Sequence, residues 1–576
     1  MYSASGMSTD RTQGPIAAPA PFDKPSADII LRTSDRIDFR VHSQVLTLAS
    51  PFFETMLSLP QPILQRSDEN TKAEARAGAD AQRSPGSSLI IAATHALPGF
   101  KSEDPSLPII DVSEDSTTLE LLLRILYPLP KPQMETVAAL VPAVKAAQKY
   151  EMEWPLEILS ERLVDIVRNP LTAPHVWAAA CRTGLEDVAR RAALSMRKSG
   201  NLNASLSAAA GFENAEAAAL GFMEELGPMD GISAGDYFRL KRFLQADQAK
   251  IDDGSLLLLT PLPGEVSPVP SPSIPGSFHT DMSSTDVICR SRYGDPGASP
   301  ASFYAHQSVL SVFSPVLKER LTDLRQATAH SHVPDAAPPP DTHPQPLVLM
   351  FEEDPDTLAE LLSLCYNDDA RLWSLDETAS LLVAIKKYQM SKVERRPRDY
   401  WNQWATQFPL TVYLVATTCG LIPEAAAAAK LVLQLGQMGE YATKMETSSA
   451  LAYHRLLKYH DSYRRLVRDQ FTAAANKLPS SNIDIFVSRR GYNTSLRVDG
   501  VRSALLKDYP CGDRLRTEQE LRQVLRDVIS KSLVTQGWQE DGQGRAYAFV
   551  QAILEVIMTL PKKLEDEVGT IKLEFD

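Results

Sequence analysis

Side chains that could carry chemistry are scattered along this 576-residue chain. Catalysis needs groups that converge, such as a nucleophile with its base, a pair of carboxylates or a metal cluster. The sequence contains no G-x-S-x-G, no phosphate-cradling glycine loop and no H-E-x-x-H. We therefore predict no catalytic residue, no cofactor and no metal site, and we do not expect the protein to be an enzyme.

Two histidines and two aspartates recur in similar surroundings. His42 and His306 each lie where a strand-like pattern passes into a helix-like one, so their rings could bond backbone groups at that corner. We favour this structural role over catalysis or metal binding. Asp28 and Asp286 begin strand patterns, and we interpret them as solvated or turn-capping carboxylates.

The cysteines also favour structural roles. They form no close C-x-x-C pair, so neither a zinc module nor a disulfide framework is indicated. All but the last lie among apolar residues, as small core hydrophobes do. The five are Cys181, Cys289, Cys365, Cys419 and Cys511.

Acidic clusters occur at residues 352–354 and 368–369. A hard-cation site needs several oxygens fixed by one loop, and nothing in these stretches fixes such a loop. We predict that both clusters are solvated surface.

Composition narrows the classes of partner. The formal net charge is −13, whereas nucleic-acid and anionic-membrane binders need clustered Lys and Arg. No apolar stretch is long enough to span a bilayer, and the N-terminus lacks the pattern of a signal peptide. We expect an intracellular protein of the cytoplasm or nucleus, with protein partners and with neither a nucleic-acid nor a membrane partner.

The elements that position these residues occur twice. Residues 27–57 read strand, turn, strand and helix, and Pro51 breaks the helical run because proline disfavours the helical region for the residue before it. The pattern returns at residues 284–317. A helix ending in Tyr127 matches one ending in Tyr366, and both are followed by a Lys-Tyr-x-Met helix.

This duplicated pattern resembles the BTB/POZ fold, in which an aspartate-led strand precedes aromatic-x-x-His-x-x-Val-Leu and a serine before a second short helix. Tandem copies are familiar among fungal BTB-domain proteins, which this chain resembles. The resemblance implies an α+β fold in which each unit has a small sheet covered by helices. The matched fold-signature positions are Asp28, His42, Ser50, Tyr127, Asp286, His306, Ser314 and Tyr366.

The repeat continues beyond these cores, because Tyr237-Phe238-Arg239-Leu240 matches Tyr453-His454-Arg455-Leu456. We therefore predict that each unit carries an α-helical extension. The predicted segments are a disordered arm (1–24), a first BTB/POZ-like domain (25–167, insertion 61–105), a helical extension (168–250), a Pro/Ser-rich linker (251–282), a second BTB/POZ-like domain (283–395, insertion 322–346), a second extension (396–478) and a mainly helical C-terminal α/β tail (479–576).

The resemblance implies a non-enzymatic scaffold for protein–protein interaction. Proteins of this fold pair with themselves, recruit corepressors, or join a substrate receptor to a cullin-type ubiquitin ligase. We expect the two cores to pair as an intramolecular pseudo-dimer or the chain to form a homodimer. The alternatives are a substrate adaptor that binds a cullin scaffold, a transcription-associated regulator, and, from another class, an enzyme within residues 480–576.

Two departures from the family pattern bear on these alternatives. In transcriptional members the strand aspartate pairs with a basic residue just after the histidine, but Ser43 and Gln307 occupy that position here. Cullin-binding members carry an apolar-x-Glu motif after the second short helix. Leu317-Lys318-Glu319 has that spacing but comes earlier in the chain.

Overall fold

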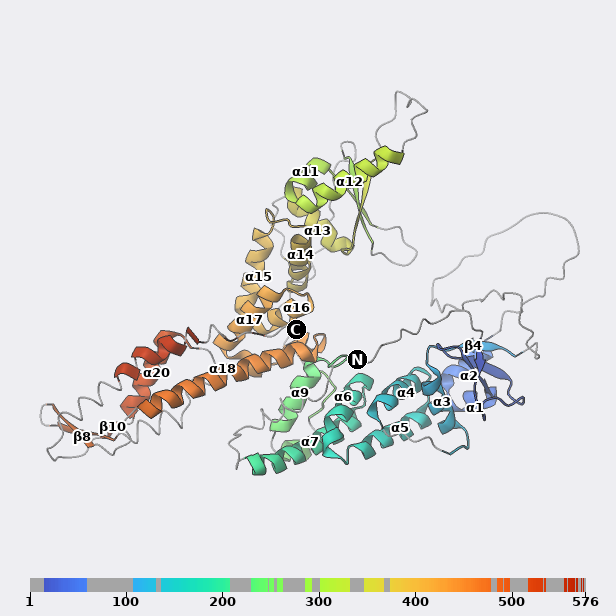
Figure 1. The fold of residues 1–576 in the computed structure, drawn as a ribbon, viewed down its shortest axis with the longest axis horizontal. Coiled ribbons are helices and arrows are strands. Elements are labelled where there is room, and N and C mark those ends of the chain that lie inside the picture. The colour runs from blue at the N-terminus through green and yellow to red at the C-terminus, as the bar shows by residue number, and fades with distance from the viewer. Residues whose placement is uncertain are drawn as a thin grey trace, which may run out of the picture. The chain divides into compact units, whose positions relative to one another are not determined.

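The computed structural model describes the chain in segments separated by gaps. These are residues 15–59, 107–130, 136–207, 229–246, 248–252, 256–262, 285–292, 301–331, 346–366, 373–477, 484–489, 492–497, 516–531, 533–534, 554–556, 558–564, 566–567, 571 and 573. The chain divides into two compact units, Met1–Ala192 and Ala193–Asp576. In the described segments, helices are combined with small sheets, so the fold is α+β as predicted (Figure 1).

The first sheet has four strands in the order β1-β3-β2-β4. They are β1 (Ile16–Ala17), β2 (Ile29–Arg32), β3 (Ile37–Val41) and β4 (Ile109–Asp111). β2 pairs antiparallel with β3 and parallel with β4. Leu31, Phe39 and Val41 are buried, as alternation predicts for strands with one face on a core.

Short and medium helices complete the first module, a name we use for residues 25–167. They are α1 (Ser43–Ala49), α2 (Pro51–Ser58), α3 (Ser116–Leu126), α4 (Val137–Lys149) and α5 (Glu153–Ile166). α1 and α2 are separate because Ser50 is extended, at φ −148° and ψ 111°. Pro51 then takes the first helical position, where its missing N–H costs nothing. α4 packs against α3 and α5.

The N-terminal segment differs from the predicted disordered arm over residues 1–24. From residue 15 onward it is ordered, because β1 pairs in parallel with β3 and the Ala18 N–H donates to the Asp38 carbonyl at 2.9 Å. Phe22 is buried, with its ring 5.6 Å from that of Phe39 and 5.7 Å from that of Tyr127. A free strand edge and an aromatic contact therefore stabilise a segment whose composition alone predicts no structure.

The first helical extension begins with two consecutive helices joined by a short turn. Its elements are η1 (Pro170–Thr172), α6 (Ala173–Thr183) and α7 (Glu186–Ser207). α6 ends at Gly184, whose φ of +69° is a left-handed conformation that glycine adopts without a Cβ penalty. α6 packs against α4 and α5 of the first module.

The second sheet repeats the pairing of the first. Its strands are β5 (Val287–Ser291), β6 (Ser302–Ala305) and β7 (Leu347–Phe351), in the order β6-β5-β7. β5 is antiparallel to β6 and parallel to β7, as β2 is to β3 and β4. Val287, Cys289 and Phe351 lie in one buried apolar core.

Four helices complete the second module, a name we use for residues 283–395. They are α11 (Gln307–Phe313), α12 (Pro315–Ser331), α13 (Pro355–Tyr366) and α14 (Leu375–Lys387). α12 extends into the predicted insertion over residues 322–346. Residues 322–331 contain no glycine or proline, so helix propagation continues where a loop was expected.

The second helical extension contains long helices within the second unit. They are α15 (Arg395–Gln407), α16 (Pro409–Thr418), α17 (Ile422–Leu435) and α18 (Ala450–Lys477), with 3₁₀ turns η2 (Gln437–Gly439) and η3 (Thr443–Glu446) before α18. α9 (Ala234–Gln245) and the short α10 (Gln248–Asp252) come from the first extension. α9 packs against η3 and α18, so the two extensions meet.

The predicted linker over residues 251–282 is also partly packed. Leu258 is buried, and its carbonyl accepts from Arg239 Nε at 2.6 Å. The Pro- and Ser-rich composition of the linker did not predict this contact. The contact depends on one apolar residue, Leu258, and on Arg239, which lies 19 residues earlier in the chain. The insertion at residues 61–105 and most of the linker lie outside the described residues.

The tail contains the predicted strand pair. β8 (Asp484–Arg489) and β9 (Tyr492–Arg497) are antiparallel, and β10 (Leu533–Val534) pairs with β9 after helix α20 (Glu518–Lys531). In the parts of the chain that the structure describes, no helix is both long and apolar enough to cross a membrane.

Candidate functional site

The same corner is built at the end of the second strand in each module. The backbone N–H of His42 donates to the Tyr127 hydroxyl at 2.9 Å, and that of His306 donates to the Tyr366 hydroxyl at 2.7 Å. The histidine Nδ1 atoms lie 3.2 Å and 3.0 Å from the same hydroxyls. Each tyrosine, coming from the end of a distant helix, therefore holds the strand-to-helix turn in place.

Both tyrosine hydroxyls are protonated at neutral pH, and burial raises the pKa of Tyr127 and of Tyr366 further, above the ordinary value. Each hydroxyl can accept the backbone N–H and direct its own proton to Nδ1. We predicted that the rings bond backbone groups; the prediction of a structural role agrees with this geometry, but the ring partner is a side-chain hydroxyl.

The two aspartates cap the first helix of each module. Asp28 Oδ1 accepts from the Ser43 N–H at 2.7 Å, and Asp286 Oδ1 accepts from the Gln307 N–H at 2.7 Å. In the first module Oδ2 also accepts from the Ser43 hydroxyl. Burial alone would raise the pKa of Asp28, but the Ser43 hydrogen bonds outweigh it and lower the pKa. These carboxylates satisfy helix N–H groups and do not pair with a cation at position 43 or 307.

Gln307 differs from Ser43 in one further respect. Its Oε1 atom is buried and has no hydrogen-bond partner. The second module therefore carries a buried unsatisfied carbonyl at the position where the first has a hydroxyl bonded to aspartate.

The two serines join both short helices to the rest of the module. Ser50 Oγ accepts from the Phe53 N–H at 3.1 Å and donates to the Tyr150 carbonyl. Ser314 Oγ accepts from the Leu317 N–H at 3.0 Å and donates to the Tyr388 carbonyl at 2.6 Å. Both serines are fully buried, so each satisfies a helix start and a distant backbone carbonyl at once.

A second polar group is repeated that the sequence did not predict. Tyr150 donates to Glu114, and Lys149 lies 3.0 Å from the same carboxylate. The equivalent contacts join Tyr388 to Glu353 at 2.6 Å and Lys387 to Glu353 at 2.8 Å. The repeated Lys-Tyr-x-Met sequence was the available signal, although it did not reveal the acidic partner.

Backbone geometry supports the equivalence of these groups. The residue after each tyrosine has positive φ, +53° at Glu151 and +51° at Gln389. Burial alone would raise the pKa of Glu114, but hydrogen bonds from Tyr150 and Lys149 lower it. Burial and the hydrogen bond to glutamate raise the pKa of Tyr150 and Tyr388. Each group is therefore a carboxylate bound to a cation and a protonated phenol.

This finding corrects part of the prediction for the acidic cluster at residues 352–354. Glu352 is exposed, as predicted, but Glu353 is largely buried against Lys387 and Tyr388. Asp354 accepts from the Thr357 N–H at 2.9 Å and so caps α13. The run of acidic residues suggested a solvated surface, but Glu353 binds side chains that lie over thirty residues later, and Asp354 caps the helix that follows. Residues 368–369 lie outside the described part of the chain.

The cysteines in the described residues are free thiols. Cys289 and Cys365 are buried, and burial raises the pKa of each to about 12. Cys181 and Cys419 are partly buried, while Cys511 lies outside the described residues. The described residues contain no group of three or more His, Cys, Asp or Glu side chains arranged to hold a metal ion.

The outer side of the first short helix exposes one apolar residue in each module, beside a polar one (Gln44 or Ser308). Leu48 of α1 is 91% exposed, and Val312, its equivalent in α11, is 58% exposed. In the second module Val312 borders a pocket of about 370 Å³ whose wall includes Phe313, Ile385 and Met390. Lys392, another wall residue, donates to the Val312 carbonyl at 3.0 Å. The surface next to this pocket can receive an apolar side chain.

The apolar-x-Glu sequence at residues 317–319 has a different role. Leu317 is buried in the core, and its N–H is the one that Ser314 caps. The leucine of this sequence is therefore used in packing α12 and is not presented to a partner.

Comparison with known proteins places one part of this geometry in a family. Residues 278–403 match the family model of the BTB/POZ domain. A search of curated proteins finds no significant match to the chain. BTB/POZ domains are non-enzymatic modules that mediate protein–protein interaction and dimerisation. Residues 278–403 are therefore similar to a BTB/POZ domain, and this matched range contains β5 to α14, with Asp286, His306, Ser314 and Tyr366.

Proposed function

We propose that this protein is a non-enzymatic interaction scaffold that carries two BTB-like modules, one at residues 25–167 and one at residues 283–395. The match of residues 278–403 to the BTB/POZ domain is the observation that carries the interaction role. The tandem arrangement, and with it the likeness to fungal BTB-domain proteins, is the part of the proposal that extends beyond this match.

The support for a second copy is the agreement in hydrogen bonding between the two modules. Both use a tyrosine on the histidine N–H, an aspartate on the next N–H, and a serine between the short helices. Both also have the Glu-Lys-Tyr group and a positive φ after the tyrosine. Contacts of this kind require matching backbone paths as well as matching residue types.

We further propose that partners bind the outer surface of α1 and α11, around the exposed apolar residue of each. Leu48 and Val312 occupy equivalent positions there, and apolar groups left in water at a mixed apolar and polar surface favour protein binding. Lys386, which lines the Val312 pocket, is engaged by Glu424 at 2.8 Å, and the pocket wall combines apolar with polar residues such as Gln389 and Ser391. The expected partner is a protein segment with an apolar anchor residue.

The test is a native pull-down of the tagged full chain from its own cell extract, read by mass spectrometry. We expect Val312→Glu and Leu48→Glu each to reduce recovery of a distinct partner at least tenfold. Leu171→Glu is the matched control, because Leu171 is 72% exposed and lies outside both modules. Equal recovery with all three variants would contradict the proposed surface.

The same experiment distinguishes narrower roles. Recovery of a cullin with its ring-finger partner would identify a ubiquitin-ligase adaptor, whereas recovery of transcriptional corepressors would identify a transcription-associated regulator. Recovery of a second tagged copy of the chain would identify a homodimer. Asp28 and Asp286 are bonded to helix N–H groups and not to a cation, which supports a general scaffold over corepressor binding of the usual kind.

A further inference from the structure

The two helical extensions carry a longer repeat than their four-residue match. Residues 229–240 read Met-Asp-Gly-Ile-Ser-Ala-Gly-Asp-Tyr-Phe-Arg-Leu, and residues 445–456 read Met-Glu-Thr-Ser-Ser-Ala-Leu-Ala-Tyr-His-Arg-Leu. A constant offset of 216 residues (445 − 229) relates the two segments. Both methionines are buried, and each segment leads into a helix, α9 or α18.

The backbones of these two segments contact each other reciprocally. The Ala234 N–H donates to the Ser448 carbonyl at 2.8 Å, and the Ala450 N–H donates to the Ile232 carbonyl at 2.9 Å. Ala450 is the equivalent of Ala234, and Ile232 is the equivalent of Ser448, so the two bonds are related by the same offset. Ser233 and Ser449, which are equivalent, face each other as an antiparallel bridge.

The side chains follow the same rule. The rings of the equivalent residues Tyr237 and Tyr453 lie edge to face at 5.7 Å. Tyr237 stacks on His454 at 5.9 Å, and reciprocally Tyr453 contacts Phe238 at 6.2 Å.

The helix caps are also equivalent. Ser233 Oγ accepts from the Asp236 N–H at 2.9 Å, and Ser449 Oγ accepts from the Ala452 N–H at 3.2 Å. In an isologous interface, residue i contacts residue j and j contacts i. The contacts of α9 with the start of α18 have this property.

We propose that these segments form an isologous interface closed within one chain, so that the protein is a covalently joined dimer of its duplicated unit. The partner of residues 229–245 is the second copy, residues 445–461. We predicted that the two modules pair; the geometry points to the helical extensions as the self-pairing surface, and pairing between the cores stays a prediction.

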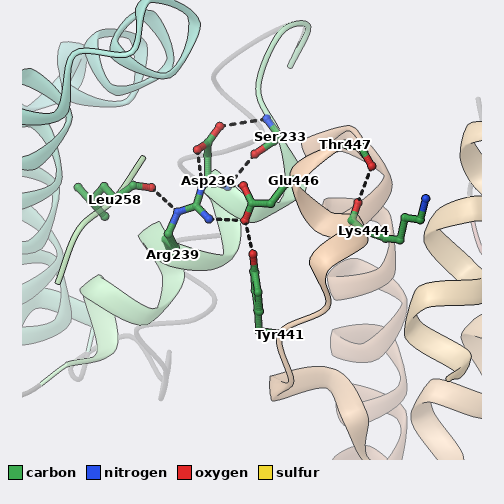
Figure 2. A network of polar contacts seen from close by, with 8 residues as sticks. All are labelled: Ser233, Asp236, Arg239, Leu258, Tyr441, Lys444, Glu446 and Thr447. Carbon is green, nitrogen blue, oxygen red and sulfur yellow. Dashed lines mark hydrogen bonds and ion pairs between the residues drawn. The ribbon is translucent and has the colours of Figure 1, made fainter. Parts of the chain in front are cut away.

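One charged cluster departs from the symmetry (Figure 2). Arg239 is only 3% exposed and donates to Asp236 Oδ1 at 2.7 Å and to both Glu446 oxygens, one of them at 3.1 Å. Tyr441 donates to Glu446 Oε1 at 2.7 Å. Burial and this hydrogen bond raise the pKa of Tyr441 to about 12.

The cluster favours pairing of unlike copies. The equivalent of Asp236 is Ala452, and the equivalent of Glu446 is the shorter Asp230. Pairing α9 with a second α9 would place the shorter Asp230 opposite Arg239 in place of Glu446. Pairing α18 with a second α18 would place Glu446 opposite Arg455, whose own helix has Ala452 where α9 has Asp236. Among these pairings, only that of unlike copies gives the buried arginine both a glutamate across the interface and an aspartate on its own helix.

Gly235 makes room for this carboxylate. A Cβ atom at Gly235 would lie 2.2 Å from Glu446 Oε1, whereas a Cβ at Gly439 in η2 would meet nothing within 4 Å. The equivalent of Gly235 is Leu451, which is 39% exposed. A glycine is therefore needed at position 235 of α9 and not at the equivalent position 451 of α18. Gly439→Ala is the matched control for Gly235→Ala.

The first test uses the full chain with a protease site inserted within residues 263–284, between the two copies. After cleavage we expect both fragments to elute together in size-exclusion chromatography with light scattering. Gly235→Ala and Arg239→Met should each raise the dissociation constant of the fragments at least tenfold, and Gly439→Ala should leave it unchanged. Separation of the unmodified fragments, or equal association of all variants, would overturn the proposal.

A second test detects the pairing through a covalent bond. Ser233→Cys with Ser449→Cys, facing each other across the bridge, should form a disulfide within one chain under mild oxidation. Non-reducing electrophoresis after cleavage between the copies should then show the fragments joined, with each single variant unjoined. Absence of this disulfide would overturn the paired geometry, and a disulfide that joins two chains would overturn closure within one chain.

Discussion

The first and second modules share the hydrogen bonds that end on the backbone of the corner and differ in one side-chain bond beside it. Tyr127 and Tyr366 accept equivalent histidine N–H groups, and Ser50 and Ser314 reach equivalent tyrosine carbonyls. By contrast, the Ser43 hydroxyl bonds Asp28, whereas the side-chain carbonyl of Gln307 has no partner. The comparison indicates that the chain path at the corner is the shared requirement.

A second difference lies in the sheets. Arg32 forms an ion pair with Asp38 across β2 and β3 at 2.8 Å. At the equivalent register, Arg290 donates to the neutral hydroxyl of Ser302 at 3.2 Å. Both pairs lie at partly exposed sites, where a change of one partner costs little. The residue opposite the arginine can therefore differ between the modules while the pairing register of the two strands stays the same.

The largest expected effect tests the shared backbone contacts. Ser50→Ala and Ser314→Ala each remove a helix cap and leave a tyrosine carbonyl buried without a donor, so each should destabilise its module by about 2–3 kcal/mol. Hydrogen exchange read by mass spectrometry should show faster exchange in residues 51–58 or 315–331 respectively.

The matched control is Ser58→Ala, whose hydroxyl donates to the Thr55 carbonyl at an exposed site and should matter by less than about 0.5 kcal/mol. An effect in one module and none in the other would contradict the equivalence of the two serines.

The next effect concerns the acidic partner of Tyr150. Glu114→Gln should destabilise the first module by about 1–2 kcal/mol at neutral pH, because it weakens charge-assisted hydrogen bonds from Tyr150 and Lys149. The folded pKa of Glu114 is lowered, so its contribution is present above the ordinary glutamate pKa and is lost as the pH falls through the folded value.

The difference between Glu114→Gln and the unmodified chain should therefore shrink in acid. Urea unfolding followed by hydrogen exchange in residues 137–149, at pH 7 and at about pH 3.5, measures it. Glu157→Gln, an exposed change on α5, is the control. A pH-independent difference would show that Glu114 acts by packing and not by charge.

Residue types at fixed spacing predicted the corner but not its partners. Asp28, His42 and Tyr127 meet at the start of α1, whereas Ser50 caps α2 and reaches the Tyr150 carbonyl. The ring partner of His42 required knowing where a helix 85 residues later ends. Contacts at such sequence separation are set by tertiary packing, which local periodicity does not report.

The interface between the helical extensions shows the same limit. Four matched residues predicted that the extensions are related, and the longer repeat beginning at Met229 and Met445 was the stronger signal. Even the full match does not state that the copies touch, because a repeat is equally compatible with two separate units. The reciprocal bonds of Ala234 and Ala450 supply that information.

A smaller effect should appear when the residue after the histidine is exchanged between modules. Gln307→Ser removes a buried unsatisfied carbonyl and offers Asp286 a hydroxyl donor, so it should stabilise the second module by about 1 kcal/mol. Ser43→Gln should destabilise the first module by a similar amount. Protection of the α11 and α1 amides against hydrogen exchange measures both, and unchanged protection in the two variants would contradict this account of the corner.

The smallest expected effect tests the difference between the sheets. Ser302→Asp gives Arg290 a carboxylate at the register where Arg32 meets Asp38, and a partly exposed pair of this kind should add about 0.5 kcal/mol. Because salt screens such a pair, the gain should disappear in about 1 M salt, where the Debye length falls to about 3 Å. Ser302→Asn is the control of similar size without charge. A gain of equal size in Ser302→Asn, or one that persists in high salt, would show that shape and hydrogen bonding, and not the ion pair, distinguish the two sheets.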